Sequence, residues 1–115
     1  MARQCFVLDL KDDPDLIARY RAWHAPGGPP AAVISSIRAA GIEDMEIHLS
    51  GDRLFMIMDT GPGFSAEAKA AADAADPDVQ AWERLMSEFQ RPAPSAKPGE
   101  KWTPAERIFA LSEQP

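Results

Sequence analysis

The sequence predicts an α+β domain in which helices cover one face of an antiparallel sheet. Apolar or alternating segments typical of strands lie at residues 5–10, 45–49, 54–58 and 107–111. Helical segments with their own start and stop signals follow the first and the third of these strands. A short turn joins the second strand to the third, which predicts an antiparallel hairpin. This β-α-β-β-α-β order is that of the ferredoxin-like arrangement.

Composition predicts one soluble domain over residues 1–115. The chain has 12 Lys and Arg against 18 Asp and Glu, a net charge of −6, and 45% of its residues are hydrophobic. A chain of this length can bury a core without disulfides or a structural metal. Its scattered basic residues argue against a nucleic-acid partner.

Its apolar runs, such as Leu54–Met58, are far shorter than the roughly 20 residues of a membrane span. The lone Cys5 cannot form an internal disulfide, and the first residues lack the features of a signal peptide. We therefore expect a cytoplasmic protein without a membrane partner.

The first crossover is predicted to be two helices. Asp13 is an N-cap acceptor placed directly before a proline at the first helical position, which predicts a helix over Pro14–His24. Residues 25–30 hold three prolines and two glycines and cannot continue it. A second helix then runs to Gly41, which is expected as its C′ glycine.

The second half repeats the pattern. Residues 45–49 alternate apolar and polar side chains, as a half-buried strand does, and residues 50–53 form a turn before the next strand. Residues 64–75 are rich in alanine and are predicted to be helical. The Asp76-Pro77-Asp78 segment starts a further helix that ends near Gln90. An apolar stripe on that helix is expected to face the sheet: Val79, Trp82, Met86 and Phe89. A loop over residues 91–101 then leads to the last strand.

The sheet face opposite the helices needs a cover. An apolar face left in water would be a large exposed patch, so we expect either a homodimer packed sheet to sheet or a sheet that curls around a pocket.

The two histidines are the natural acid/base candidates, because imidazole titrates near neutral pH. Tyr20 and His24 are four residues apart and share one face at the end of the first predicted helix. A structural role is favoured by spacing alone, with His24 capping the helix and Tyr20 in the core. His48 falls on the polar side of its strand, where a solvated histidine is expected.

Trp82 and Glu83 suggest a second kind of site. Sugar sites often stack an aromatic ring on the sugar while a carboxylate accepts a hydroxyl proton, although core packing of Trp82 and a solvated Glu83 would explain both residues. No Cys/His cluster, phosphate loop or nucleophile elbow is present, which favours an activity without metal or cofactor. Cys5 is expected to be a structural thiol in the first strand.

Over nearly its whole length the sequence resembles the L-rhamnose mutarotases and their L-fucose-type relatives. Seven segments carry the resemblance, in order: residues 5–13, Tyr20 with His24, residues 36–42, 44–47, 53–58, 79–83 and 97–102. The resemblance implies a dimeric ferredoxin-like α+β barrel. It also implies exchange of the α and β anomers of a 6-deoxy-hexose, with L-rhamnose as the first expectation and L-fucose as the alternative.

The resemblance also implies roles for single residues. His24 stands at the catalytic histidine, Tyr20 at a substrate-binding tyrosine, and Trp82 and Glu83 at the aromatic pair that contacts the sugar. Met45 stands where the rhamnose enzymes have another tyrosine, and Glu83 where some have a second tryptophan, so the preferred sugar can differ. No cofactor or metal is implied.

A third departure is Pro30-Ala31-Ala32, which replaces the Trp-Pro-Glu expected after the histidine and suggests an altered wall of the site. Two alternatives are kept, the first because of the fold and the second because of this changed loop. One is a non-catalytic or oxygenase-like module for a hydrophobic ligand, and the other is a mutarotase scaffold without activity.

Overall fold

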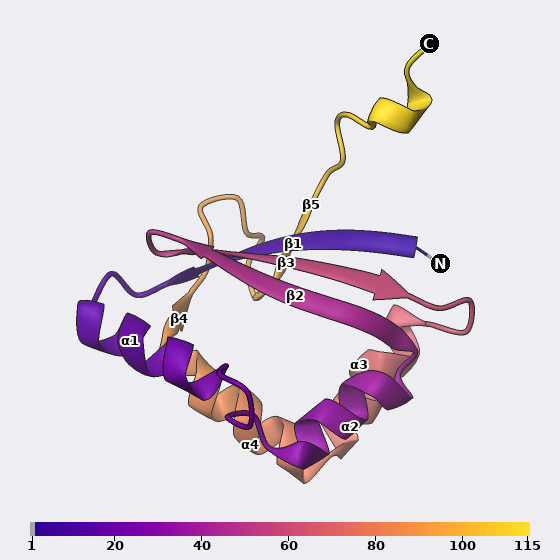
Figure 1. Ribbon diagram of the computed structural model, residues 1–115. Coiled ribbons are helices and arrows are strands. Elements are labelled where there is room, and N and C mark those ends of the chain that lie inside the picture. The colour runs from indigo at the N-terminus through magenta and orange to yellow at the C-terminus, as the bar shows by residue number, and fades with distance from the viewer. Residues whose placement is uncertain (1) are drawn as a thin grey trace.

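A computed structural model describes residues 2–115 and confirms the α+β architecture (Figure 1). All strand pairings are antiparallel, the strand order is β2-β3-β1-β4, and β5 pairs with β1. The four α-helices lie on one side of the sheet (Figure 1). In chain order the elements are β1 (Ala2–Leu10), α1 (Pro14–Trp23), α2 (Ala31–Ala39), β2 (Ile42–Ser50), β3 (Arg53–Thr60), α3 (Ala66–Ala75), α4 (Pro77–Ser87), β4 (Gln90–Arg91), β5 (Thr103–Ala105) and the short 3-10 helix η1 (Leu111–Glu113).

The central ladder fixes which side chains face the helices. β1 pairs with β3 so that Phe6 lies opposite Met56 and Leu8 opposite Leu54. Because side chains alternate along a strand, these residues share the helix-covered face, which we call the inner face. The predicted hairpin is confirmed, since Ser50 pairs with Arg53 across a two-residue turn.

The start of α1 is confirmed as predicted. The Asp13 side chain accepts hydrogen bonds from the backbone N–H groups of Asp15, at 2.9 Å, and Leu16, at 3.1 Å. Pro14 occupies the first turn, where its missing N–H costs nothing. The helix ends at Trp23, and His24 is its C-cap. A histidine therefore lies at the junction between α1 and the following loop.

The split crossover is also confirmed. α2 ends at Ala39 and Gly41 follows with a φ of +91°, a conformation that side chains other than glycine rarely adopt. The Gly41 N–H donates to the carbonyl of Arg38 at 3.1 Å and satisfies one of the last helical carbonyls. This turn delivers the chain into β2.

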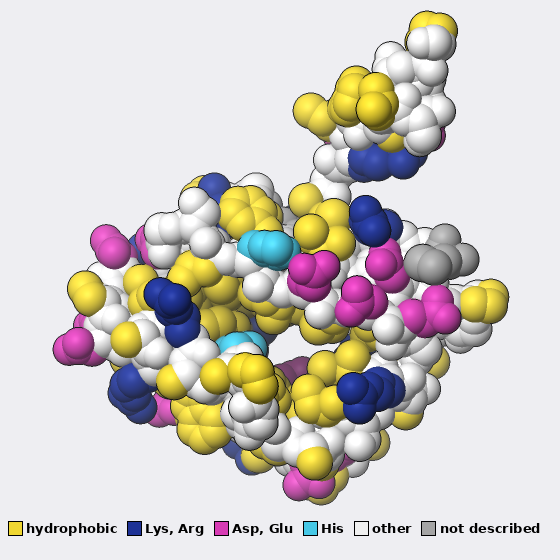
Figure 2. All heavy atoms as spheres, viewed as in Figure 1, with side chains coloured by type: hydrophobic (Ala, Val, Ile, Leu, Met, Phe, Trp, Pro, Cys, Tyr) yellow, Lys and Arg dark blue, Asp and Glu magenta, His cyan; other side chains and the backbone are white. Residues whose placement is uncertain are grey.

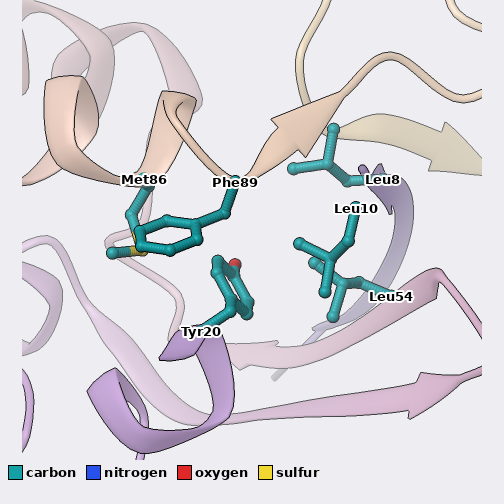
Figure 3. Packing of buried hydrophobic residues seen from close by; sticks show 6 residues of the cluster. All are labelled: Leu8, Leu10, Tyr20, Leu54, Met86 and Phe89. Atoms are coloured by element: carbon teal, nitrogen blue, oxygen red, sulfur yellow. The ribbon is translucent and has the colours of Figure 1, made fainter. Parts of the chain in front are cut away.

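The core lies between the inner face, α1 and α4 (Figure 3). It is a cluster of buried side chains: Leu8, Leu10, Tyr20, Leu54, Met86 and Phe89. The stripe predicted on α4 does face the sheet, because Val79 and Met86 are buried and Trp82 packs against the cluster. Burial of each such side chain is worth roughly 1.5–3 kcal/mol.

The predicted last strand is wrong. β5 covers Thr103–Ala105, whereas residues 107–111 are not in a strand, and Ile108, Phe109 and Leu111 are 89%, 64% and 78% exposed. Residues 106–115 form an extended arm that points away from the helices (Figure 1). The apolar pattern misled the prediction because nothing in residues 2–115 packs over these side chains. β4, which pairs with the end of β1, falls where a helix end and a loop were expected.

The opposite sheet surface, which we call the outer face, is apolar at its centre. The register places Cys5, Val7, Phe55 and Ile57 there, and Phe55 is 41% exposed. Cys5 is half-buried on this face. At one end the buried carboxylate of Asp9 accepts hydrogen bonds from Arg53 Nε at 2.8 Å and Nη2 at 3.2 Å.

Candidate active site

A cavity of about 380 Å³ lies between the inner face and the helices, and its wall is mostly apolar. Figure 2 shows the hollow beneath the sheet, with hydrophobic side chains around its opening. The volume suits one small molecule. All five predicted site residues line it: Tyr20, His24, Met45, Trp82 and Glu83.

Tyr20 and His24 meet at the end of α1. Their ring centroids are 4.2 Å apart, and His24 Nδ1 lies 2.7 Å from the backbone carbonyl of Tyr20. A carbonyl can only accept, so Nδ1 carries the proton and donates it to that carbonyl. The neutral imidazole then holds its lone pair on Nε2. The helix-capping role expected from spacing is thus real, and it leaves one ring nitrogen able to take up a proton.

Burial sets the charge of His24. Desolvation lowers its pKa below the ordinary 6.5, while the hydrogen bond to the Tyr20 carbonyl raises it in part. The Trp82 ring lies against the imidazole, with centroids 5.6 Å apart and the planes tilted by 60°. At neutral pH the imidazole is therefore uncharged and can act as a base.

Burial acts in the opposite sense on Tyr20. Desolvation raises the pKa of its phenol above 10.0, although a hydrogen bond from Gln90 opposes the shift. Gln90 Nε2 donates to the Tyr20 hydroxyl at 3.1 Å. The phenol is protonated at neutral pH and can donate a hydrogen bond or a proton. Sequence reasoning missed Gln90, because a glutamine at a predicted helix end carries no local signal.

Trp82 and Glu83 come from α4. Trp82 packs edge to face against Trp23, with ring centroids 6.0 Å apart, so its ring is held by two neighbours. Glu83 is half-buried, and its Oε2 accepts a hydrogen bond from Gln80 Nε2 at 3.3 Å. This carboxylate is one of the few charged groups on the cavity wall.

Four methionines form much of the remaining wall: Met45, Met56, Met58 and Met86. Met45 lies on β2, directly opposite Met58 of β3. Next to the histidine the wall is made by Pro29 and Val33, whereas Pro30, Ala31 and Ala32 are exposed where α2 begins. The substituted loop segment thus lies beside the cavity.

Two further observations concern the rest of the chain. His48 lies on the outer face, exposed, with Nε2 3.4 Å from a carboxylate oxygen of Glu46. It is therefore separate from the cavity. Over residues 2–115 there is no group of three or more His, Cys, Asp or Glu arranged to hold a metal ion, nor any helix long and apolar enough to cross a membrane.

The sequence profile of the L-rhamnose mutarotases matches residues 3–111. The chain belongs to this family. It is a sugar mutarotase, an isomerase that acts on carbohydrates. A curated relative, the L-fucose mutarotase of Xanthomonas campestris pv. campestris, is 54% identical over 113 residues, covering 98% of this chain and 90% of that protein.

Solved structures agree with this fold. The L-rhamnose mutarotase of Formosa agariphila superposes with a TM-score of 0.66 at 15% identity, over 96% of this chain and 99% of that one. The tetracenomycin F2 cyclase of Streptomyces glaucescens superposes with a TM-score of 0.64 at 14% identity, over 96% of each chain. At such low identity these matches bear on the fold alone, and they confirm the predicted fold class.

Proposed function

We propose that this mutarotase exchanges the anomers of L-fucose, with His24 as its acid/base group. The observation that carries this proposal is a half-buried, neutral imidazole on the cavity wall, anchored through Nδ1–H to the Tyr20 carbonyl. L-rhamnose is the sugar expected from the sequence. We choose L-fucose instead because the relative at 54% identity is an L-fucose mutarotase. Met45 and Glu83, which depart from the rhamnose pattern, both lie on the cavity wall, where a changed side chain can alter the preferred sugar.

The chemistry requires two proton movements. Nε2 of His24 accepts the proton of the anomeric hydroxyl while the bond between C1 and the ring oxygen breaks, and the ring oxygen gains a proton. The Tyr20 hydroxyl, beside the imidazole, gives its proton to the ring oxygen and takes a proton back from His24 Nε2. The open aldehyde rotates about C1–C2 and recloses on its other face by the reverse steps. Positioned proton transfer of this kind contributes about 10²–10⁴-fold.

The other wall residues hold the sugar. The Trp82 ring offers an apolar face to the C–H groups of the pyranose, and Glu83 accepts a hydrogen bond from a hydroxyl. The methionines contact the remaining apolar surface, including the C6 methyl group. The mostly apolar wall, with its few charged groups, suits an uncharged sugar.

Magnetisation-transfer NMR between the α and β anomeric protons tests this proposal. Purified protein should accelerate exchange of L-fucose over the spontaneous rate, and it should accelerate L-rhamnose less. Faster exchange of L-rhamnose would reverse the choice of sugar. No acceleration of either would favour the module that binds a hydrophobic ligand.

We also propose that two copies of the chain pack through their outer faces. The apolar centre of this face and the exposed Ile108 and Phe109 of the arm both remain uncovered in one chain. A two-fold axis would let each copy cover the other's face and arm at once.

Sedimentation equilibrium tests the dimer. A mass near twice 12.6 kDa is expected at micromolar concentration. Removal of residues 107–115 should shift the equilibrium toward the monomer. A monomer in the full-length chain would contradict the proposal.

A further inference from the structure

We propose that Gln90 determines specificity by binding the C2 hydroxyl of the sugar. This inference rests on the proposed function and adds to it a contact outside the predicted site residues. The contact joins β4, a strand that sequence reasoning did not anticipate, to the reacting end of the cavity.

The backbone around Gln90 is fixed from both sides. Gln90 pairs with Leu10 across the β1–β4 ladder, and the N–H of Lys11 donates to the carbonyl of Phe89 at 2.8 Å. Gln90 therefore shares the inner face with Leu10, and its side chain lines the cavity. A side chain held on a strand in this way can position its amide well.

The amide of Gln90 is only half satisfied by the protein. Its Nε2 donates to the Tyr20 hydroxyl at 3.1 Å, while its Oε1 is buried and has no hydrogen-bond partner within residues 2–115. A buried amide oxygen without a partner is costly and uncommon. A hydroxyl group of a bound molecule would supply the missing donor, and this requires a small shift of the Gln90 side chain that opens Oε1 to the cavity.

Gln90 and Tyr20 place an acceptor and a donor side by side on the cavity wall. Because the Tyr20 oxygen accepts from Gln90, its own proton is directed elsewhere and can be donated. The carbonyl of the same amide is an acceptor close to that donor. A sugar hydroxyl that donates to this carbonyl lies beside the Tyr20 hydroxyl, whose own proton is given to the ring oxygen.

The covalent structure of the sugar indicates which of its hydroxyl groups Gln90 binds. Tyr20 lies against His24, so the adjacent Gln90 faces the neighbourhood of C1. C1 is flanked by the ring oxygen and by C2. Beyond the ring oxygen, C5 of a 6-deoxy-hexose carries only hydrogen and a methyl group, which donates no hydrogen bond. The anomeric hydroxyl on C1 itself donates to His24 Nε2 in the proposed mechanism, so the hydroxyl on C2 is the nearest donor left for Gln90.

This contact would discriminate between the two candidate sugars. L-fucose and L-rhamnose have opposite configurations at C2, and also at C4. A site built to hydrogen-bond one hydroxyl disfavours a sugar that leaves its buried acceptor unpaired. We infer that Gln90 reads the configuration at C2.

The test compares L-fucose with 2-deoxy-L-fucose, with the spontaneous exchange of each subtracted. Wild-type protein should have a kcat/KM for L-fucose about tenfold above that for the 2-deoxy sugar. Gln90→Met removes both amide functions at nearly constant volume. It should lower kcat/KM for L-fucose about tenfold, mainly through KM, and leave the 2-deoxy sugar within about twofold. Gln4→Met makes the same change on β1, outside the cavity lining, and should leave both values unchanged.

The outcomes separate the two proposals. Wild-type protein that does not accelerate L-fucose exchange overturns the proposed function and this inference with it. Active wild-type protein that treats both sugars alike overturns the inference alone, whether or not the variant folds. An equal loss on both sugars in Gln90→Met also overturns it, since Gln90 would then act only by positioning Tyr20.

Discussion

One histidine lies on each side of the sheet, and the two imidazoles have different surroundings. His24 lies at the end of α1 between the rings of Tyr20 and Trp82, with one ring nitrogen committed to a backbone carbonyl. His48 lies exposed on the outer face beside Glu46. Partial burial lowers the pKa of His24, and the surrounding side chains place its imidazole on the wall of the cavity. Residue type alone therefore does not identify the reactive imidazole.

The largest effect that would test this contrast is the loss of His24. His24→Asn keeps a polar side chain but removes the base, so the exchange rate should fall about 10²–10⁴-fold. His48→Asn is the matched control and should leave the rate unchanged, as measured by magnetisation transfer on L-fucose. Equal losses in both variants would contradict the assignment.

The next largest effect concerns the outer face. Ile57→Arg places a charge at its apolar centre, and the cost of burying that charge should raise the dimer dissociation constant about a hundredfold. Ser35→Arg adds the same charge on the exposed surface of α2, away from the outer face, and should change the constant little. Sedimentation measures both. An unaffected dimer in Ile57→Arg would show that the copies meet elsewhere.

A smaller effect is expected at the Tyr20 hydroxyl. Tyr20→Phe keeps the ring contacts with His24 and Phe89 and removes the relay, so kcat should fall about tenfold while the fold persists. Circular dichroism checks the fold and NMR exchange the rate. A rate equal to that of the wild type would remove Tyr20 from the proton path.

The smallest effect is a displaced pH profile. The neutral form of His24 is the base, so the rate should rise with pH through its pKa, which burial places below 6.5. More than half of the plateau rate should therefore remain at pH 6.5. His48→Asn should give the same profile. A midpoint above 6.5 would show that another group, or a differently solvated His24, controls the reaction.

Local signals predicted the part of the molecule in which sequence neighbours act together. The Asp13-Pro14 start, the spacing of Tyr20 and His24 and the Gly41 stop each depend on adjacent residues, and each was confirmed in the structure. The five predicted site residues share one cavity, while their chemical roles remain predictions.

Non-local features escaped prediction. β4 forms because the end of β1 offers it a partner 80 residues away, and Gln90 meets Tyr20 across 70 residues. Residues 107–111 have the apolar pattern of a strand, yet within one chain they are exposed. An apolar pattern indicates that a segment will be buried, but it does not indicate which surface will bury it.

The methionines that line the cavity make the activity of the protein sensitive to oxidation. Every methionine after Met1 contributes to the wall. Thioethers adapt their shape to a bound ligand, but peroxide converts them to polar sulfoxides. Oxidation would place new oxygen atoms against the apolar side of the sugar and fill space that it needs. Peroxide should thus inactivate the protein without touching its histidine, bound sugar should slow that loss, and methionine sulfoxide reductases should reverse it.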